Sequence, residues 1–435
     1  MSIVGCFACV VPELSREELM DPQQCAECHP DHYDEWSGSM HAYAAEDPVF
    51  LAMNERGQRE TGGELGDFCI NCHAPMAVRE GFTTDGLNIA EAPSHLRGIT
   101  CYFCHNTVDV TGDHNNPLVL ADDRSMRGGI DGALANTGHK SKYSELHDRD
   151  RIESSELCGA CHDIVTPVGL HLERSFKEWR ESIYAHDKPG LRQTCNSCHM
   201  QGRDAPAADY EGVVVRRVHK HSFAGVDTAL TDFPNMEAQR EEVQTSLDTT
   251  IATELQVCPI PAGTEITLTL ENISAGHSWP SGAAQDRRAW VELIAYDGQD
   301  NVLWSTGVVD EATALLSVED PQLWRFGDTL FDDGGNKVHM FWDATELESY
   351  LLPAPTAFDP LAPEYIDTHL SRSWQLPGIF AERVTARLRI RPVGLDVLDD
   401  LIDSGDLDPA IRGRMNTIDL AGSTRKWTTN VGPCE

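Results

Sequence analysis

Long apolar runs and positive charge are both scarce in this chain of 435 residues. No stretch approaches the roughly 18 apolar residues of a membrane-spanning helix. Lysine and arginine number 34 against 70 aspartates and glutamates, so the formal net charge is -36. Nucleic acids and anionic lipid headgroups need a basic surface, and the charge argues against both as partners. Basic or metal-bearing partners remain, although the charge also serves solubility alone.

The start of the chain lacks the basic residues that open a complete signal peptide. It is MSIVGCFACVV, a short apolar run. Residues 3–6 resemble the lipobox at which bacterial lipoproteins are cleaved and lipidated, so we expect a lipid anchor at Cys6 and a truncated signal within residues 1–20. The alternative is an apolar tail with an unrelated cysteine.

Cysteine, by contrast, is abundant, and ten of the 14 cysteines fall in one repeated pattern. In Cys-x-x-Cys-His, a short helical turn presents two thiols to the vinyl groups of a haem, and the histidine becomes the proximal ligand of the iron. The pattern occurs five times, at Cys25, Cys28 and His29; Cys69, Cys72 and His73; Cys101, Cys104 and His105; Cys158, Cys161 and His162; and Cys195, Cys198 and His199.

Zinc sites and disulfide frameworks explain this pattern less well. A zinc ribbon needs two Cys-x-x-Cys pairs for one metal ion and has no use for a histidine after each pair. A disulfide framework does not need that histidine either. The sequence therefore predicts five covalently attached haem c groups with their iron.

Four cysteines lie outside the motifs. Cys6 and Cys9 belong to the N-terminal run, and Cys258 and Cys434 bracket the second half of the chain. Haem of this kind is attached in an oxidising compartment, so we expect a Cys258–Cys434 disulfide, with two buried free thiols as the alternative. The same compartment predicts a periplasmic, outer-membrane or cell-surface location.

The sequence pattern changes after the last motif. We expect residues 21–225 to form a mostly α-helical and irregular pentahaem domain, with helices at 31–45 and 175–185. Residues 226–250 are expected to be a linker whose EAQREEVQ stretch is helical. Short alternating segments with turn signals predict an antiparallel, immunoglobulin-like β-sandwich over residues 251–435. Its expected elements are strands at 265–270, 287–309, 337–344, 382–393 and 426–432, and a helix at 394–405.

The histidines outside the motifs decide the function. The chain has 18 histidines, and removing the five proximal ones leaves 13. An iron with two axial ligands passes electrons, whereas an iron with an open position also binds small molecules.

A family resemblance suggests which histidines are distal ligands. CAECHPDHYDEWSGSMHAYA and CYFCHNTVDVTGDH resemble the tetrahaem cytochrome that accepts electrons in hydroxylamine oxidation, and HKHSFAGVD is similar to related multihaem cytochromes. The resemblance covers about residues 22–228. It implies that His41 caps the haem on His105, that His114 caps the haem on His29, and that His221, preferred over His219, caps the haem on His162 or His199.

The tetrahaem resemblance does not supply the two remaining distal ligands. His95 has no match in the tetrahaem pattern but resembles a histidine of larger relatives. We assign it to the haem on His73. In the tetrahaem family the corresponding second haem lacks a sixth ligand. The candidates for the remaining haem are His139, His147, His171, His186 and His277.

The second half carries a resemblance of its own. AGHSWPSGAAQDRRAWVELI is similar to a C-terminal domain of bacterial multihaem cytochromes, in which a Gly-His-x-x-Pro-x-Gly loop precedes an Arg-rich strand. His277 in that loop is expected either to be a distal ligand or to hydrogen-bond within the sandwich. Arg287 and Arg288 either pair with haem propionates or neutralise nearby carboxylates, and we favour the second.

The chain also departs from these families, and three hypotheses follow. It has five motifs and no Cys-x-x-Cys-Lys, so it does not resemble the pentahaem nitrite reductases. The leading hypothesis is electron transfer to redox partner proteins, with no catalytic residue predicted. The second is an oxidoreductase acting on a small nitrogen or sulfur species at one five-coordinate haem. The third is a conductive assembly, an oligomer or filament in which the β domain binds its neighbour.

Overall fold

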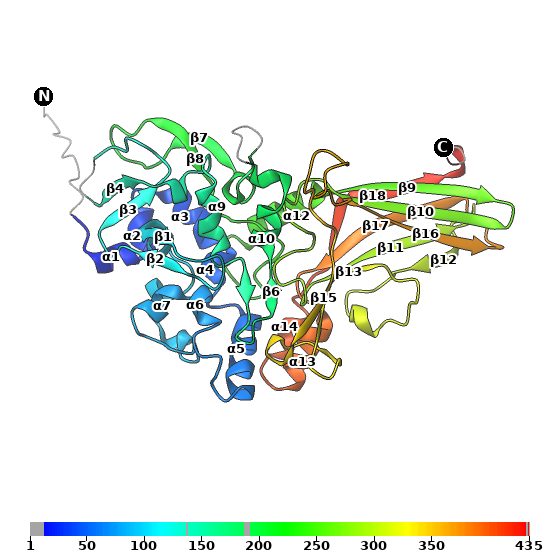
Figure 1. Ribbon diagram of the computed structural model, residues 1–435, viewed down its shortest axis with the longest axis horizontal. Helices are drawn as coiled ribbons and strands as arrows, with labels where there is room; N and C mark the ends of the chain where they lie inside the picture. The colour runs from blue at the N-terminus through cyan, green and yellow to red at the C-terminus, as the bar shows by residue number, and fades with distance from the viewer. Residues whose placement is uncertain (1–12, 136–137, 187–191, 432–433, 435) are drawn as a thin grey trace, which may run out of the picture.

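The computed structural model describes residues 13–135, 138–186, 192–431 and 434. Figure 1 shows a motif-bearing region, coloured blue to green, beside a sheet region, coloured green to red. The lipobox and Cys6 lie outside the described residues, so the lipid anchor stays a prediction. Within these ranges no helix is long and apolar enough to cross a membrane.

The motif-bearing region consists of short helices and two-stranded ribbons. Its helices are α1 (Arg16–Met20), α2 (Pro22–Ala26), α3 (Pro30–Ser37), α4 (Met40–Tyr43), α5 (Pro48–Glu60), α6 (Ile70–His73), α7 (Pro75–Arg79), α8 (Cys101–Asn106), α9 (Glu153–Gly159), α10 (Ser175–Arg180) and α11 (Cys195–His199). Its strands are β1 (Thr107–Val110), β2 (Leu118–Leu120), β3 (Ser125–Gly128), β4 (Lys140–Tyr143), β5 (Ile164–Val165), β6 (His171–Glu173), β7 (Gly202–Pro206) and β8 (Val215–His219).

Each expected long helix of this region is broken into two pieces. The segment 31–45 forms α3 and α4, because Gly38 ends the first helix and the Ser39 hydroxyl accepts the Ala42 amide at 3.3 Å to begin the second. The segment 175–185 forms α10 and a short 3-10 turn, which Ser182 caps. A side-chain oxygen that accepts an orphan amide starts a new helix at that point.

The sheet region is an antiparallel sandwich, as expected. Its elements are α12 (Met236–Asp248), β9 (Ile251–Ile260), β10 (Gly263–Asn272), β11 (Arg288–Tyr296), β12 (Val302–Thr306), β13 (Arg325–Phe331), β14 (Lys337–Val338), β15 (Glu346–Tyr350), β16 (His369–Pro377), β17 (Arg383–Arg391), α13 (Leu395–Asp403), α14 (Pro409–Arg412) and β18 (Ile418–Thr428). In the described residues, β16-β10-β9 form one sheet, and β14-β13-β11-β17-β18 form the spine of the other, which β12 and β15 extend.

The two sheets share one apolar core. Alternate residues of β10 are buried, including Ile266, Leu268 and Leu270, as the period of two in a strand requires. They pack in one cluster with Leu293 of β11 and Leu388 of β17. The burial of these faces against each other holds the sandwich together.

Most expected elements of the sandwich are confirmed, one is wrong, and one is confirmed only in part. The strand expected at 426–432 is the end of β18 up to Thr428, and a 3-10 turn at Thr429–Val431 follows it. The strands at 265–270 and 382–393, the pair within 287–309, and the helices in the linker and at 394–405 are all present. The segment 337–344 forms only the two-residue strand β14 and a 3-10 turn at Phe341–Asp343.

Helix α5 of the motif-bearing region packs on α13 of the sheet region. Val49 and Ala52 share an apolar cluster with Leu398 and Leu401. Two ion pairs flank this cluster, Arg56 with Asp400 at 3.0 Å and Arg59 with Asp406. The contact fixes the sandwich against the part of the chain that carries the motifs.

Cys258 and Cys434 form a disulfide, which confirms the expected pairing. Their Cα atoms lie 5.1 Å apart, within the usual range for a disulfide. The bond attaches the end of the chain to β9.

Candidate haem sites

All five motifs open onto one cavity of about 2010 Å³. Every motif cysteine and every motif histidine contributes to its wall. Helical turns present these side chains, as expected. The amide of the motif histidine donates to the carbonyl of the first cysteine, for example from His29 to Cys25 at 2.7 Å and from His162 to Cys158 at 3.1 Å.

The motif histidines are held in the form that binds iron. Four of them donate Nδ1–H to a backbone carbonyl, which leaves Nε2 available for a metal. The acceptors are Ala207 for His29 at 2.7 Å, Ala44 for His73 at 3.0 Å, Arg127 for His105, and Ala224 for His199 at 2.8 Å.

Burial keeps these imidazoles neutral at physiological pH. Loss of solvent lowers the pKa of His29 and of His162 to about 4, and it lowers the pKa of the other three motif histidines as well. Neutral imidazole is the state that ligates a metal ion. The donor set, two thiols and one oriented imidazole per motif, fits covalent haem c.

The motifs lie next to one another through their thiols. Three pairs of thiols from different motifs lie close enough to shift each other's pKa: Cys25 and Cys101, Cys72 and Cys161, and Cys158 and Cys195. The first motif therefore neighbours the third, and the fourth motif neighbours both the second and the fifth.

Seven of the other histidines also line the cavity, and the described residues include all 13. The seven are His32, His41, His139, His147, His219, His221 and His277. The six that do not contribute to its wall are His95, His114, His171, His186, His339 and His369.

Five of the seven face a motif histidine at a distinctive separation. A bond between a metal and an imidazole nitrogen is about 2.0 Å long, so two imidazoles on one iron have ring centroids about 6 Å apart. The observed centroid separations are 6.2 Å for His41 and His162, 6.2 Å for His221 and His105, 6.4 Å for His277 and His199, and 6.2 Å for His139 and His29. The ring of His32 also stands 6.2 Å from that of His29, so two imidazoles are candidates for this one iron, and we favour His139 because it comes from a different segment of the chain.

The pairing differs from the one that the resemblance implies. His41 lies against His162 and not against His105, whose opposing ring is His221. His277, which was one of several candidates for the remaining haem, lies against His199 with the two ring planes 6° apart. The loop before β11 therefore reaches across to the motif-bearing region.

The structure does not bring His95 and His114 to the cavity. His114 is 42% exposed, and its Nδ1 donates to the neighbouring Asp113 carboxylate at 2.9 Å. His95 lies in a surface 3-10 turn, Ser94–Leu96. A ligand role for either residue stays a prediction that the observed side-chain positions do not favour.

The surroundings of His73 differ from those of the other motif histidines. Phe50 of α5 stacks on the His73 ring with centroids 3.9 Å apart and planes 4° apart. Among the described residues, no histidine ring faces His73 at the separation seen for the other four pairs. Asp47, which caps α5, lines the cavity nearby, and burial raises its pKa to about 6.

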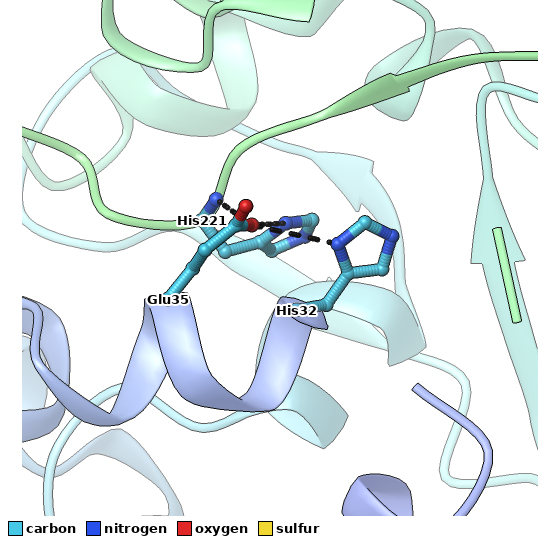
Figure 2. A group of neighbouring side chains, drawn as sticks. All are labelled: His32, Glu35 and His221. Carbon is cyan, nitrogen blue, oxygen red and sulfur yellow. Dashed lines mark hydrogen bonds and ion pairs between the residues drawn. The ribbon is translucent and has the colours of Figure 1, made fainter. Parts of the chain in front are cut away.

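Sequence reasoning missed His32, which lies beside the site. It follows His29 by three residues, and this spacing within α3 was the available signal, because residues three apart share one helix face. Figure 2 shows His32, Glu35 and His221 gathered around the Glu35 carboxylate. The three side chains place potential ligand atoms within 4.8 Å of one another.

The two arginines before β11 neutralise carboxylates, as we favoured. Arg287 forms a two-pronged pair with Asp227 at 2.8 and 3.0 Å, and Arg288 pairs with Asp396 at 2.6 Å. Both guanidinium groups are largely buried. Their planar geometry suits bidentate binding of a carboxylate.

Comparisons with known proteins agree with this site. A family model described as cytochrome c554 and c-prime matches residues 24–106. The chain is also similar to the crystal structure of a penta-heme cytochrome c552 from Thermochromatium tepidum, with a TM-score of 0.63 and 20% identity over 93% of this chain and 97% of that one. A search of curated proteins finds no match.

Together with the five motifs, the match over residues 24–106 and the shared fold support the classification of the chain as a multihaem c-type cytochrome. Covalently bound haem c, and electron transfer through it, are what this classification implies. The fold, a helical and irregular region followed by an antiparallel sheet region, is shared with the solved pentahaem protein.

Proposed function

We propose that this cytochrome carries electrons through five covalently bound haems to and from redox partner proteins. The observation that carries the proposal is the single cavity onto which all five Cys-x-x-Cys-His motifs open. The proximity of the motif thiols supports a continuous path. The first motif neighbours the third, the fourth neighbours the second and the fifth, and Cys104 of the third motif, after Cys72 and burial, also raises the pKa of Cys161 of the fourth, which joins the two groups. Closely spaced haems pass electrons without a bound substrate.

Four distal ligands belong to the same proposal. His41, His221, His277 and His139 complete the irons on His162, His105, His199 and His29, respectively. Two of these distal imidazoles, His221 and His277, donate Nδ1–H to a backbone carbonyl, as metal ligands usually do, and so do the motif histidines His29 and His199.

The haem number and ligation are tested on the purified protein. Intact-mass spectrometry is expected to give the polypeptide plus five haem masses, and electron paramagnetic resonance (EPR) of the ferric protein is expected to show mainly low-spin iron. Fewer than five haems, or mainly high-spin iron, would overturn the proposal.

A second candidate function rests on His73. The lack of a facing imidazole among the described residues favours an open position on that haem, where a small nitrogen or sulfur species could be reduced or oxidised. One high-spin signal per chain, lost on adding cyanide or nitrite, is the expected result. Entirely low-spin iron that cyanide does not perturb would rule this function out.

We also propose a location outside the cytoplasm, in the periplasm or at the cell surface. Covalent haem attachment and the Cys258–Cys434 disulfide both suit an oxidising compartment. Cell fractionation with the full-length gene product tests this location, and recovery of haem-loaded protein in the cytoplasmic fraction would contradict it.

A further inference from the structure

Glu35 is a largely buried carboxylate between two histidines. It lies on α3 one helical turn after His32, and its side chain is 16% exposed. His221 approaches from the segment that follows β8 (Figure 2). Burying a carboxylate costs free energy unless hydrogen bonds and ion pairs compensate for the lost water. The partners of the Glu35 carboxylate are therefore the groups that it positions.

Glu35 makes contacts that hold its own side chain in place and fix the position of His221. Its Oε2 accepts the backbone N–H of His221 at 3.0 Å, and its Oε1 pairs with Arg203 of β7 at 3.1 Å. His32 Nδ1 lies 3.5 Å from Oε2, and the His32 ring packs on the His221 ring with centroids 4.7 Å apart. The carboxylate thus anchors the backbone of His221, and His32 supports its ring.

The side chains of His32, Glu35 and His221 resemble a metal-binding group, but their hydrogen bonds and ion pairs argue against a non-haem metal site here. His221 Nδ1 donates to the His219 carbonyl at 2.9 Å and lies 4.0 Å from Glu35. Its Nε2 is then the nitrogen left for a metal, and the ring stands 6.2 Å from His105. The carboxylate is already engaged by the His221 amide and by Arg203.

We propose that Glu35 is a positioning residue that fixes His221 as the distal ligand of the haem on His105 and lowers the reduction potential of that haem. The inference rests on the proposed electron-transfer function. A backbone clamp limits the movement of the ligand, and a nearby negative charge stabilises ferric iron more than ferrous iron.

Two variants separate the effect of the backbone hydrogen bond from that of the charge. Glu35→Ala removes both, so one low-spin EPR signal is expected to broaden and the potential of the same haem to rise. Glu35→Gln keeps an oxygen that accepts the His221 amide, so it is expected to restore the signal while leaving the potential raised. A severalfold to tenfold shift toward ferrous haem at fixed potential is expected, and tenfold corresponds to about 59 mV.

Asp31→Asn is the matched control. Asp31 lies on the same helix and pairs with the same Arg203 at 3.1 Å, but its side chain is 70% exposed. It is expected to change neither the EPR signal nor the potential. His32→Ala is expected to leave the haem on His105 low-spin, because His32 packs on the ring of His221 and does not take its place on that iron.

Several outcomes would overturn the inference. Among them are a wild-type spectrum and potential in both Glu35 variants, an equal shift in Asp31→Asn, or loss of the low-spin signal of the haem on His105 in His32→Ala. A stoichiometric non-haem metal that is lost with His32 would also overturn it. Haem content and spin state of the wild type test the proposed function separately, so the two failures are distinguishable.

Discussion

His277 and His199 face each other with ring centroids 6.4 Å apart and planes 6° apart, although one comes from the sheet region and the other from the last haem motif. The carbonyls of Ser278 and Ala224 accept the Nδ1–H groups of the two rings. Both Nε2 atoms are therefore available to one iron. In the proposed ligation, this pair gives the β-sandwich a direct part in haem binding.

Replacing His277 with Ala should open the haem on His199. One high-spin haem per chain is the expected EPR result, because no side chain at residue 277 then reaches the iron. The stability of the junction between the regions should fall by about 1–3 kcal/mol in chemical unfolding. His369→Ala is the control, since His369 is exposed and does not line the cavity. An unchanged spectrum in His277→Ala would assign His277 to the sandwich alone.

Replacing His41 with Ala should open the haem on His162. The sequence resemblance assigns His41 to His105 instead, so the two pairings make different predictions. In a Cys158→Ser/Cys161→Ser background, which lacks the fourth haem, His41→Ala should add no high-spin signal. If an additional high-spin haem appears in that background, the pairing in the structure is wrong and the resemblance is right.

The haem motifs could be predicted from sequence because the chemistry is local. Two thiols and one histidine within five residues determine the turn between them, whatever the rest of the chain does. Distal ligation depends on distant segments, and neither His41 nor His277 carries a local sign of the motif it meets. The resemblance predicted that His41 lies at the site, but it pairs His41 with His105, whereas the ring of His41 faces His162 in the structure.

The sandwich shows the same division between local and long-range information. The alternation in β10 and β17 was visible because one face of each strand is buried. The segment 337–344 also contains alternating apolar residues, but it forms a turn whose Met340 and Phe341 pack in two different apolar clusters. Tertiary packing determined that outcome.

Asp328 is expected to make the sandwich less stable as the pH rises. Burial raises its pKa from 3.8 to about 6, and one of its carboxyl oxygens has no hydrogen-bond partner. The folded state binds this proton more tightly than the unfolded state, so stability should fall between about pH 4 and pH 6.

Asp328→Asn tests this effect in thermal unfolding. The two-unit change in pKa corresponds to about 2–3 kcal/mol, so the variant should be stabilised by up to that amount at pH 7 and by much less at pH 4. Asp359→Asn, in an exposed segment, is the control. Equal effects of Asp328→Asn at both pH values would show that the carboxyl is not protonated in the fold.

Loss of the Cys258–Cys434 disulfide should weaken the sandwich without disturbing the haems. The bond closes a loop of 176 residues, and cross-links of this kind contribute about 2–4 kcal/mol by restricting the unfolded chain. Cys258→Ser/Cys434→Ser should therefore unfold at lower denaturant, with wild-type visible and EPR spectra, because neither cysteine lines the haem cavity. Reductant should lower the stability of the wild type and leave the double variant unchanged. A wild-type protein that is insensitive to reductant and titrates two free thiols when denatured would show that the bond does not form.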